Sequence, residues 1–238
     1  RCSKNCETKH LAIKPNISRG EMSRFDAVIF DMDGVIVNSE PVHEVAFLEI
    51  WQEMGYGETH GIRFPDFLGK SDRAVWETFI DKHRPTQSIE ELTVLKEDRL
   101  IQLLRDKQPI FDGIPTLVRR LAKHLPLAIA SGSVHRIINE VLAMRDLRRY
   151  FCCTASSEDV ANSKPEPDVF LLAAERLNVK PASCCVIEDT VAGVIAGKAA
   201  GMTVMGITNT FKSEALGQAG ADHVYQSYSA ISCFFESN

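Results

Sequence analysis

The chain has no long hydrophobic run, no excess of positive charge and no low-complexity segment. No apolar stretch approaches the roughly 20 residues that a membrane-spanning helix requires. Its 27 Lys and Arg residues against 32 Asp and Glu residues give a net charge of −5 over 238 residues. This balance argues against binding to nucleic acid or to an acidic membrane surface. With 45% hydrophobic and 25% charged residues, the composition is typical of a globular protein.

The sequence also lacks an even set of cysteines and the apolar core of a signal peptide. Of its seven cysteines, four form the adjacent pairs 152–153 and 184–185, in or beside strand-like runs. Thiols in such places act as small buried hydrophobic groups, so a disulfide framework is disfavoured. A reducing, cytoplasmic location is expected. Residues 1–21, which precede Met22, are predicted to be a dispensable, mostly disordered leader.

The stretch from Ala27 to Asn38 is the most informative part of the sequence. Its first four residues, A-V-I-F, form a short apolar run typical of a strand buried on both faces. Asp31, Asp33 and Gly34 follow directly. Two acids just past a central strand lie where an open α/β sheet places its chemistry. From this stretch alone, a helix cap and a turn explain the two aspartates equally well.

The pattern of the remaining chain predicts an α/β fold. Residues 39–107 have helical periodicity, including a capping box at Ser88-x-x-Glu91, and no convincing strand. From Pro109 onward, strand-like runs alternate with helical ones, and one strand is predicted at 150–154. Such repeats imply a parallel sheet covered by helices on both faces. We therefore predict a three-layer core interrupted after its first strand by a small helical unit.

Polar residues follow several of the predicted strands and lie close to the first aspartates if the sheet is parallel. Besides Asp31 and Asp33, they are Ser131, Lys164 and Glu188–Asp189. Together these residue types suit phosphoryl transfer. Asp31 is a candidate nucleophile that would form an aspartyl phosphate. Asp33 is placed to protonate the leaving oxygen and later to deprotonate water.

The remaining residues at this edge supply the metal ligands and the phosphate contacts. Glu188 and Asp189 offer the hard oxygens that Mg²⁺ prefers. The Ser131 hydroxyl and backbone N–H groups at Gly132 would hold phosphate oxygens at the start of the next helix. Lys164 adds positive charge to the same oxygens.

Four motifs, in order and at the expected spacing, resemble the haloacid dehalogenase superfamily of phosphohydrolases. They are D-M-D-G-V-I-V-N-S-E-P-V-H at 31–43, A-S-G-S at 130–133, S-K-P-E-P-D at 163–168 and I-E-D-T-V-A-G-V-I-A-G-K-A-A-G-M at 187–202. The branch that is most similar includes β-phosphoglucomutases and small sugar-phosphate phosphatases. The resemblance implies a Rossmann-like core at 22–38 and 108–238, with a mobile helical cap at 39–107.

The resemblance also implies a Mg²⁺ ion as cofactor. In the family the metal contacts the nucleophile, the backbone carbonyl of the second aspartate and the late acidic pair. These positions correspond to Asp31, Asp33 and Asp189 here, with Glu188 in or just outside the coordination sphere. The implied partner is a small phosphorylated metabolite, and the protein is expected to act as a monomer.

Several residues of the predicted cap and its surroundings are candidate substrate contacts, and for some of them the alternative is a structural role. His43 is placed to face the site, but a surface histidine is as compatible with its helix. Lys70, in a loop that fits the family's specificity loop, is a candidate for contact with a sugar or a distal phosphate. Ser133 is a candidate for phosphate or substrate binding. Lys96 is a weaker candidate, because a lysine there is more often on a solvated helix face. Ser39, with Asn38, is expected to serve as hinge and helix cap.

The leading functional hypothesis is a Mg²⁺-dependent phosphatase of small metabolites, with sugar phosphates as the favoured substrates. The alternative is a β-phosphoglucomutase. Two features argue against a mutase. Asn38 is followed by Ser39-Glu40-Pro41, as in many phosphatases of the branch. In the cap loop, Asp72 takes the place of an arginine that mutases use for a second phosphate. Arg73 or Lys70 would have to substitute for it. A non-catalytic sensor with this fold is disfavoured, since all the catalytic positions are present.

Overall fold

The structure is a computed structural model that describes residues 25–67 and 70–237. The leader predicted at 1–21 lies outside the described residues. At the centre is a six-stranded parallel sheet of order β3-β2-β1-β4-β5-β6. The strands are β1 Ala27–Phe30, β2 Leu127–Ala130, β3 Cys153–Ala155, β4 Cys184–Glu188, β5 Thr203–Ile207 and β6 His223–Tyr225.

The order of the strands reverses on either side of β1, which pairs with both β2 and β4. Ile29 lies opposite Ala128 on one side and opposite Val186 on the other. In a sheet of this doubly wound kind, ligands bind at the carboxyl ends of the strands beside the point of reversal. The ends of β1 and β4 are therefore the expected position of a site.

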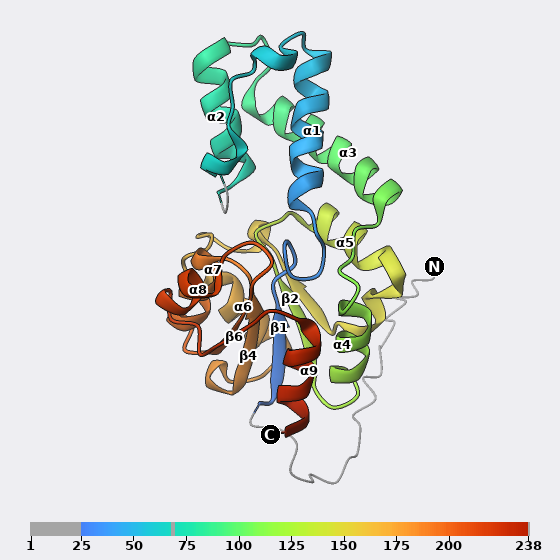
Figure 1. Cartoon of the computed structure of the whole chain (residues 1–238), viewed down its shortest axis with the longest axis vertical. Coiled ribbons are helices and arrows are strands. Elements are labelled where there is room, and N and C mark those ends of the chain that lie inside the picture. Colours follow the sequence, from blue (N-terminus) through green and yellow to red (C-terminus); the bar gives the residue numbers. More distant parts are fainter. Residues whose placement is uncertain (1–24, 68–69, 238) are drawn as a thin grey trace, which may run out of the picture.

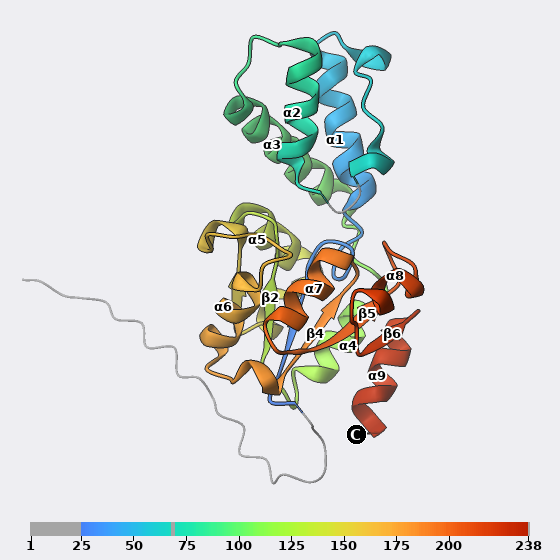
Figure 2. The same ribbon diagram turned by 90° about the vertical axis from the view of Figure 1, so that its left-hand side faces the viewer.

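Helices cover both faces of the sheet (Figures 1 and 2). Alternate residues of β1 point to opposite faces, as strand geometry requires. Val28 and Phe30 belong to one hydrophobic cluster, and Ala27 and Ile29 to the other. On the Val28 side lie α4 Ile114–Leu121, α5 His135–Ala143 and α9 Tyr228–Ser237. On the opposite side lie α6 Asp168–Leu177, α7 Val191–Ala199 and α8 Ser213–Gln218.

Three helices between β1 and α4 form a separate lobe above the sheet (Figure 1). These cap helices are α1 Glu40–Glu53, α2 Asp72–His83 and α3 Ile89–Lys107. Their shared core is aromatic, because the rings of Phe47, Trp51, Trp76 and Phe79 are buried against one another. The predicted capping box at the start of α3 is present, with Ser88 and Glu91 bonded reciprocally. Two backbone connections join the lobe to the sheet, and the amide of Asn38 donates to the carbonyl of Pro109 between them, at 2.8 Å.

The predicted fold class is confirmed, a parallel sheet with helices on both faces and an inserted helical unit. The strand predicted at 150–154 is wrong at its start, since Arg148–Tyr150 forms a 3-10 turn and β3 begins at Cys153. Cys184 and Cys185 are buried free thiols on β4, whereas Cys152 is exposed. Among the described residues, no helix has the length and hydropathy that crossing a bilayer requires.

Candidate active site

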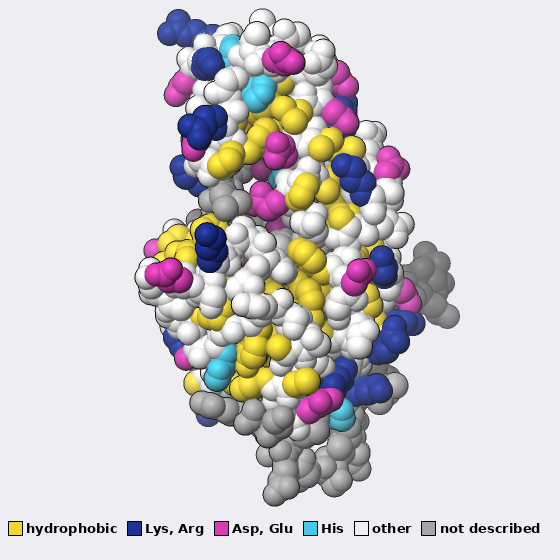
Figure 3. Space-filling view, in the orientation of Figure 1, with side chains coloured by type: hydrophobic (Ala, Val, Ile, Leu, Met, Phe, Trp, Pro, Cys, Tyr) yellow, Lys and Arg dark blue, Asp and Glu magenta, His cyan; other side chains and the backbone are white. Residues whose placement is uncertain are grey.

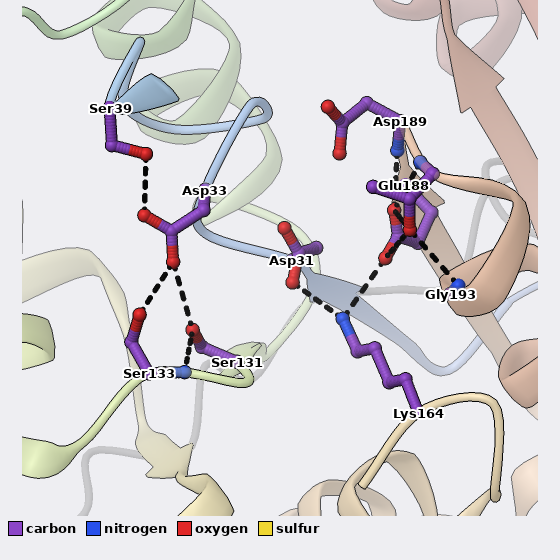
Figure 4. A network of polar contacts seen from close by, with 10 residues as sticks. Asp31, Asp33, Ser39, Ser131, Ser133, Lys164, Glu188, Asp189 and Gly193 are labelled. Carbon is purple, nitrogen blue, oxygen red and sulfur yellow. Dashed lines mark hydrogen bonds and ion pairs between the residues drawn. The ribbon is translucent and has the colours of Figure 1, made fainter. Parts of the chain in front are cut away.

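The chain turns sharply where β1 ends, and this turn holds the two aspartates (Figure 4). The Met32 carbonyl accepts hydrogen bonds from the amides of Ile36 and Val37, at 2.8 and 3.1 Å. Gly34 has a φ of +79°, and a Cβ atom there would lie 1.9 Å from a carboxylate oxygen of Asp189. Glycine is therefore required both by the backbone and by the closeness of the β4 side of the site.

Asp31 and Lys164 form a buried ion pair. Lys164 Nζ donates to Asp31 Oδ1 at 2.5 Å and to Glu188 Oε1 at 3.0 Å. Burial raises the pKa of Asp31 to about 8; the Lys164 charge opposes this shift, while the charges of Glu188 and Asp33 add to it. Burial would lower the pKa of Lys164, but the two carboxylates raise it well above its usual range. The lysine is thus a permanent cation in a pocket of carboxylates.

Both carboxylate oxygens of Asp189 are buried without a well-aligned hydrogen bond among the described residues, and the Thr210 side chain makes only a weaker contact with them. Burial, followed by the charges of Glu188 and Asp31, raises its pKa well above the usual range. Unpaired buried carboxylate oxygens are costly, which makes them candidate ligands of a cation. One oxygen from each of Asp31, Glu188 and Asp189 lies within 4.8 Å of the others. This set of hard donors fits Mg²⁺.

Glu188 has a different environment from the other two acids. Besides accepting from Lys164, its carboxylate accepts from the backbone amides of Asp189 and Thr190, at 2.5 and 2.8 Å. Glu188 therefore fixes the turn into α7 and the position of Lys164. Asp31 and Asp189 keep more free oxygen capacity for a cation than Glu188 does.

Asp33 accepts hydrogen bonds from three hydroxyl groups (Figure 4). Ser39 Oγ lies 2.6 Å from Oδ1, and the Oγ atoms of Ser133 and Ser131 lie 2.7 and 3.4 Å from Oδ2. The prediction that Ser39 caps α1 is wrong for its side chain, which makes no capping bond and faces Asp33 instead. Gly132 is exposed, and a Cβ added there would meet nothing within 4 Å. The space beside its backbone is therefore open.

Of the predicted substrate residues on the cap helices, His43 lies beside Asp33 and Lys96 lies behind His43. His43 Nε2 lies 3.9 Å from Asp33 Oδ1. Lys96 does not lie on a solvated face as the sequence favoured: its side chain is fully buried and pairs with Asp72 and His43. Lys70 is exposed, and its ammonium lies 5.3 Å from the centre of the Phe67 ring.

Two residues from the end of the chain support the turn after β1 and had no signal in the sequence. Asn209 Nδ2 donates to the Gly34 carbonyl at 2.7 Å, and the Tyr228 hydroxyl donates to the Val35 carbonyl at 2.6 Å. Asn209 follows β5 in a loop that has ordinary turn composition. Only the folded topology shows that this loop adjoins the turn after β1.

Comparison with known proteins identifies the family of the chain. A family model of haloacid dehalogenase-like hydrolases matches residues 25–201. Hexitol phosphatase B of Escherichia coli (strain K12) is 35% identical over 178 residues, covering 74% of this chain and 80% of the relative. Fructose-1-phosphate phosphatase YqaB of the same organism is 31% identical over 186 residues, covering 77% and 97%.

Solved structures give the same grouping. The crystal structure of β-phosphoglucomutase from Clostridium difficile superimposes with a TM-score of 0.71 at 25% identity, covering 90% of this chain and 98% of the other. These matches confirm the resemblance carried by the four sequence motifs. The chain is therefore an enzyme that belongs to the haloacid dehalogenase-like hydrolase family.

Proposed function

We propose that this hydrolase is a Mg²⁺-dependent phosphatase of small phosphorylated metabolites, with phosphorylated sugars or sugar alcohols as substrates. The observation that best supports this proposal is the buried ion pair of Asp31 and Lys164, which lies beside the carboxylate of Asp189. This arrangement at one edge of the sheet supports the proposed roles of Asp31 as nucleophile, Lys164 as phosphate-binding cation and Asp189 as metal ligand. The names of the two E. coli relatives, a hexitol phosphatase and a fructose-1-phosphate phosphatase, support the substrate class.

In the proposed reaction, a carboxylate oxygen of Asp31 attacks phosphorus and the ester P–O bond breaks. Asp33 gives its proton to the leaving alkoxide, so the product departs as an alcohol. Asp33 then takes a proton from water, whose oxygen attacks the aspartyl phosphate and releases inorganic phosphate and the Asp31 carboxylate. Throughout, the phosphoryl oxygens are held by Lys164, the Ser131 hydroxyl and the backbone N–H of Gly132.

The residues that would hold Mg²⁺ are Asp31, Asp189 and the backbone carbonyl of Asp33, with Glu188 orienting them. When bound, the ion supplies positive charge that offsets the repulsion between the phosphoryl group and the carboxylates. Burial and the neighbouring carboxylates raise the pKa values of Asp31 and Asp189, and the charge of a bound cation would offset both effects.

The test is phosphate release from a panel of sugar and sugar-alcohol monophosphates, with Mg²⁺ and with EDTA. Asp31→Asn is expected to abolish turnover while circular dichroism and thermal unfolding show a folded protein. Asp33→Asn is expected to lower kcat by about 10²–10⁴-fold, the range of general acid–base catalysis. The matched control is Asp26→Asn, because Asp26 is exposed just before β1. Substantial turnover by Asp31→Asn would remove the nucleophile assignment.

A mutase is the second candidate, because a β-phosphoglucomutase shares the fold. Each predicted substitute for a second-phosphate arginine makes another contact, which argues against that role. The guanidinium of Arg73 pairs with Glu77 on the surface of α2, and the ammonium of Lys70 lies over Phe67. Incubation with β-glucose 1-phosphate and a bisphosphate primer separates the two activities. Free phosphate supports the phosphatase, and glucose 6-phosphate supports the mutase.

A further inference from the structure

Two side chains from the C-terminal part of the chain hold the backbone of the turn after β1. Asn209 Nδ2 donates to the Gly34 carbonyl at 2.7 Å. The Tyr228 hydroxyl donates to the next carbonyl along the turn, that of Val35, at 2.6 Å. A third hydrogen bond joins the two side chains, because Asn209 Nδ2 also donates to the Tyr228 hydroxyl at 2.7 Å. Asn209 and Tyr228 together thus form a clamp on the turn.

The clamp uses every hydrogen-bond donor that its two side chains possess. A side-chain amide carries two N–H groups, and a phenol carries one O–H group. The amide of Asn209 gives one N–H to Gly34 and the other to Tyr228, whose own O–H goes to Val35. Burial raises the pKa of Tyr228 above its usual range, against the Asn209 hydrogen bond, so the hydroxyl keeps its proton. The clamp therefore fixes two neighbouring peptide groups and has no donor left for a phosphate.

The segment that leads into α4 supports the Tyr228 ring. The centre of this ring lies 5.9 Å from that of Phe111. A Cβ atom at Gly113 would lie 2.7 Å from Tyr228 Cβ and Cδ2, so the ring packs directly on the Gly113 backbone. Phe111 also reaches the turn through its amide, which donates to the Ile36 carbonyl at 3.2 Å. Three successive carbonyls of the turn are thus bonded from outside it.

The clamp holds the backbone beside Asp33, whereas other residues hold its carboxylate. Gly34 follows Asp33 directly, and the Gly34 amide closes the turn by donating to the Val37 carbonyl at 2.8 Å. The carboxylate accepts from the hydroxyls of Ser39 and Ser133, at 2.6 and 2.7 Å. Asp33 is therefore fixed at both its ends. Such precision matters for a catalytic group, because a misplacement of about 1 Å can lower a rate by about 10²-fold.

The clamp belongs to the sheet and its covering helices, and not to the cap. Asn209 follows β5, and Tyr228 begins α9, which lies against the sheet below the cap helices (Figure 1). Figure 3 shows Asp and Glu side chains on the wall of the hollow where the cap helices meet the rest of the molecule. No cap residue contributes to the clamp, so its loss should leave the cap side of the site intact.

We propose that Asn209 and Tyr228 are positioning residues, which aim Asp33 at the reacting oxygens by holding the backbone of its turn. The inference rests on the proposed phosphatase function and adds two residues to the machinery of the same site. Loss of the clamp leaves the Asp33 carboxylate present but less well aimed. Proton transfer by Asp33 is then impaired, whereas attack of Asp31 on phosphorus is not.

The first test is Tyr228→Phe, which removes the hydroxyl and keeps the ring. With a hexitol monophosphate and saturating Mg²⁺, kcat is expected to fall by about 10- to 100-fold while KM stays within about threefold. Asn209→Ala is expected to have the same effect. Its side chain is exposed, so water can replace its bonds and the fold should survive even where Tyr228→Phe does not fold. Thermal unfolding of each variant shows whether it is folded.

The matched control is Tyr225→Phe, three positions before Tyr228. The Tyr225 hydroxyl forms no hydrogen bond within the described part of the chain, and its ring packs against Phe234 on α9. The control therefore removes a phenol hydroxyl beside the same helix without touching the turn. Its kcat is expected to stay within about twofold of the unmodified value.

A second substrate separates loss of aim at Asp33 from general damage to the site. p-Nitrophenolate leaves without a proton, so its release from p-nitrophenyl phosphate in the first turnover should stay within about twofold in both clamp variants. Breakdown of the aspartyl phosphate still needs Asp33 as base. Steady-state turnover should therefore slow, and rapid mixing should show a burst of p-nitrophenolate.

Two results would overturn the inference. One is an unchanged kcat for the hexitol monophosphate in the folded clamp variants. The other is an equal loss in the first turnover of both substrates, because the damage would then extend to the attack of Asp31. Failure of the unmodified enzyme to hydrolyse either substrate would instead remove the proposed function itself.

Discussion

Glu188 illustrates how a single side chain can organise the site at the scale of residues. Its carboxylate is 1% exposed and accepts from a lysine and from two successive backbone amides. These bonds fix the direction in which Asp189 leaves the strand. The arrangement depends on the absence of a side chain at Gly193 on the facing turn of α7. A Cβ atom there would lie 1.6 Å from Glu188 Oε1.

Gly193→Ala is expected to displace Glu188 and to disturb both Lys164 and Asp189. Overpacking of this kind costs about 1–3 kcal/mol of unfolding free energy. The Mg²⁺ concentration for half-maximal activity should rise, since the acids no longer converge. Urea unfolding and a Mg²⁺ titration of activity provide the measurements.

Gly217 on α8 is the matched control, because a Cβ there meets nothing within 4 Å. Gly217→Ala is expected to leave the Mg²⁺ titration unchanged and to stabilise the helix by about 0.4–1 kcal/mol. If both alanine variants behave alike, the close approach of α7 to Glu188 is not what positions the acids.

At the scale of elements, Asp159 joins three segments on one edge of the sheet. Asp159 is the last residue of the 3-10 turn Ser157–Asp159. Its Oδ2 atom accepts a hydrogen bond from Arg176 Nη1 on α6 at 2.9 Å, and its Oδ1 atom lies 3.0 Å from His135 Nε2 on α5. The Arg176 hydrogen bond holds the pKa of Asp159 well below its usual range, against partial burial and with help from His135 and the Ser156 amide. The charged form therefore stabilises the contact between the two helices.

Asp159→Asn is expected to lower the free energy of unfolding by about 1 kcal/mol near neutral pH. Because the folded pKa is depressed, the stabilisation is fully present above the unfolded value of about 3.9 and is lost as pH falls below it. Urea unfolding at about pH 7, 5 and 3 should therefore show a constant difference at the first two values and a smaller one at the third. Asp146→Asn, which alters an exposed pair with Arg149, is the control and should change little at any pH. A difference that grows toward acid pH would contradict the assignment.

The elements and the polar positions could be predicted from local pattern. The short apolar runs of β1, β2 and β4 were sufficient, because a strand buried on both faces cannot be mistaken for a surface segment. The convergence of Asp31, Lys164 and Glu188 followed from the parallel order of the strands. Site roles for these residues stay predictions until the variants are measured.

What could not be predicted depends on contacts between distant segments. Lys96 lies among charged residues of α3 and has the local pattern of a solvated face. Its burial depends on Asp72, 24 positions earlier, and on His43, 53 positions earlier. Ser39 similarly looked like a helix cap because capping preference is local, whereas its bond to Asp33 depends on the turn after β1.

At the scale of the whole molecule, polar side chains join the cap helices to the Asp33 region by two routes besides the approach of His43 to Asp33. The direct route runs through Ser39, whose hydroxyl donates to Asp33. The second route consists of ion pairs between α3 and α5. Arg136 on α5 pairs with Glu97 and Asp98 on α3. Arg105 on α3 pairs with Glu140 on α5. Because α5 begins just after the Ser131–Ser133 segment that holds Asp33, the second route also ends at the site.

We expect Arg136→Ala to loosen the second route, because it removes the pairs with both Glu97 and Asp98. Exposed pairs contribute about 0–1 kcal/mol each, so KM for a sugar phosphate should rise by no more than about fivefold at low salt. In about 1 M salt the Debye length falls to about 3 Å and the pairs of the unmodified enzyme are screened as well. Steady-state kinetics at both salt concentrations should then show the two enzymes converging.

Arg73→Ala is the control that isolates the connection between lobes. The Arg73 side chain is 66% exposed and that of Arg136 is 54% exposed, but the pair of Arg73 with Glu77 lies within α2 and connects no other element. Its removal should leave KM within about twofold of the unmodified value at both salt concentrations. Equal effects of the two variants would mean that loss of surface charge, and not loss of the α3–α5 contact, alters substrate binding. An effect of Arg136→Ala that persists in high salt would mean that its guanidinium acts through packing, which salt does not screen.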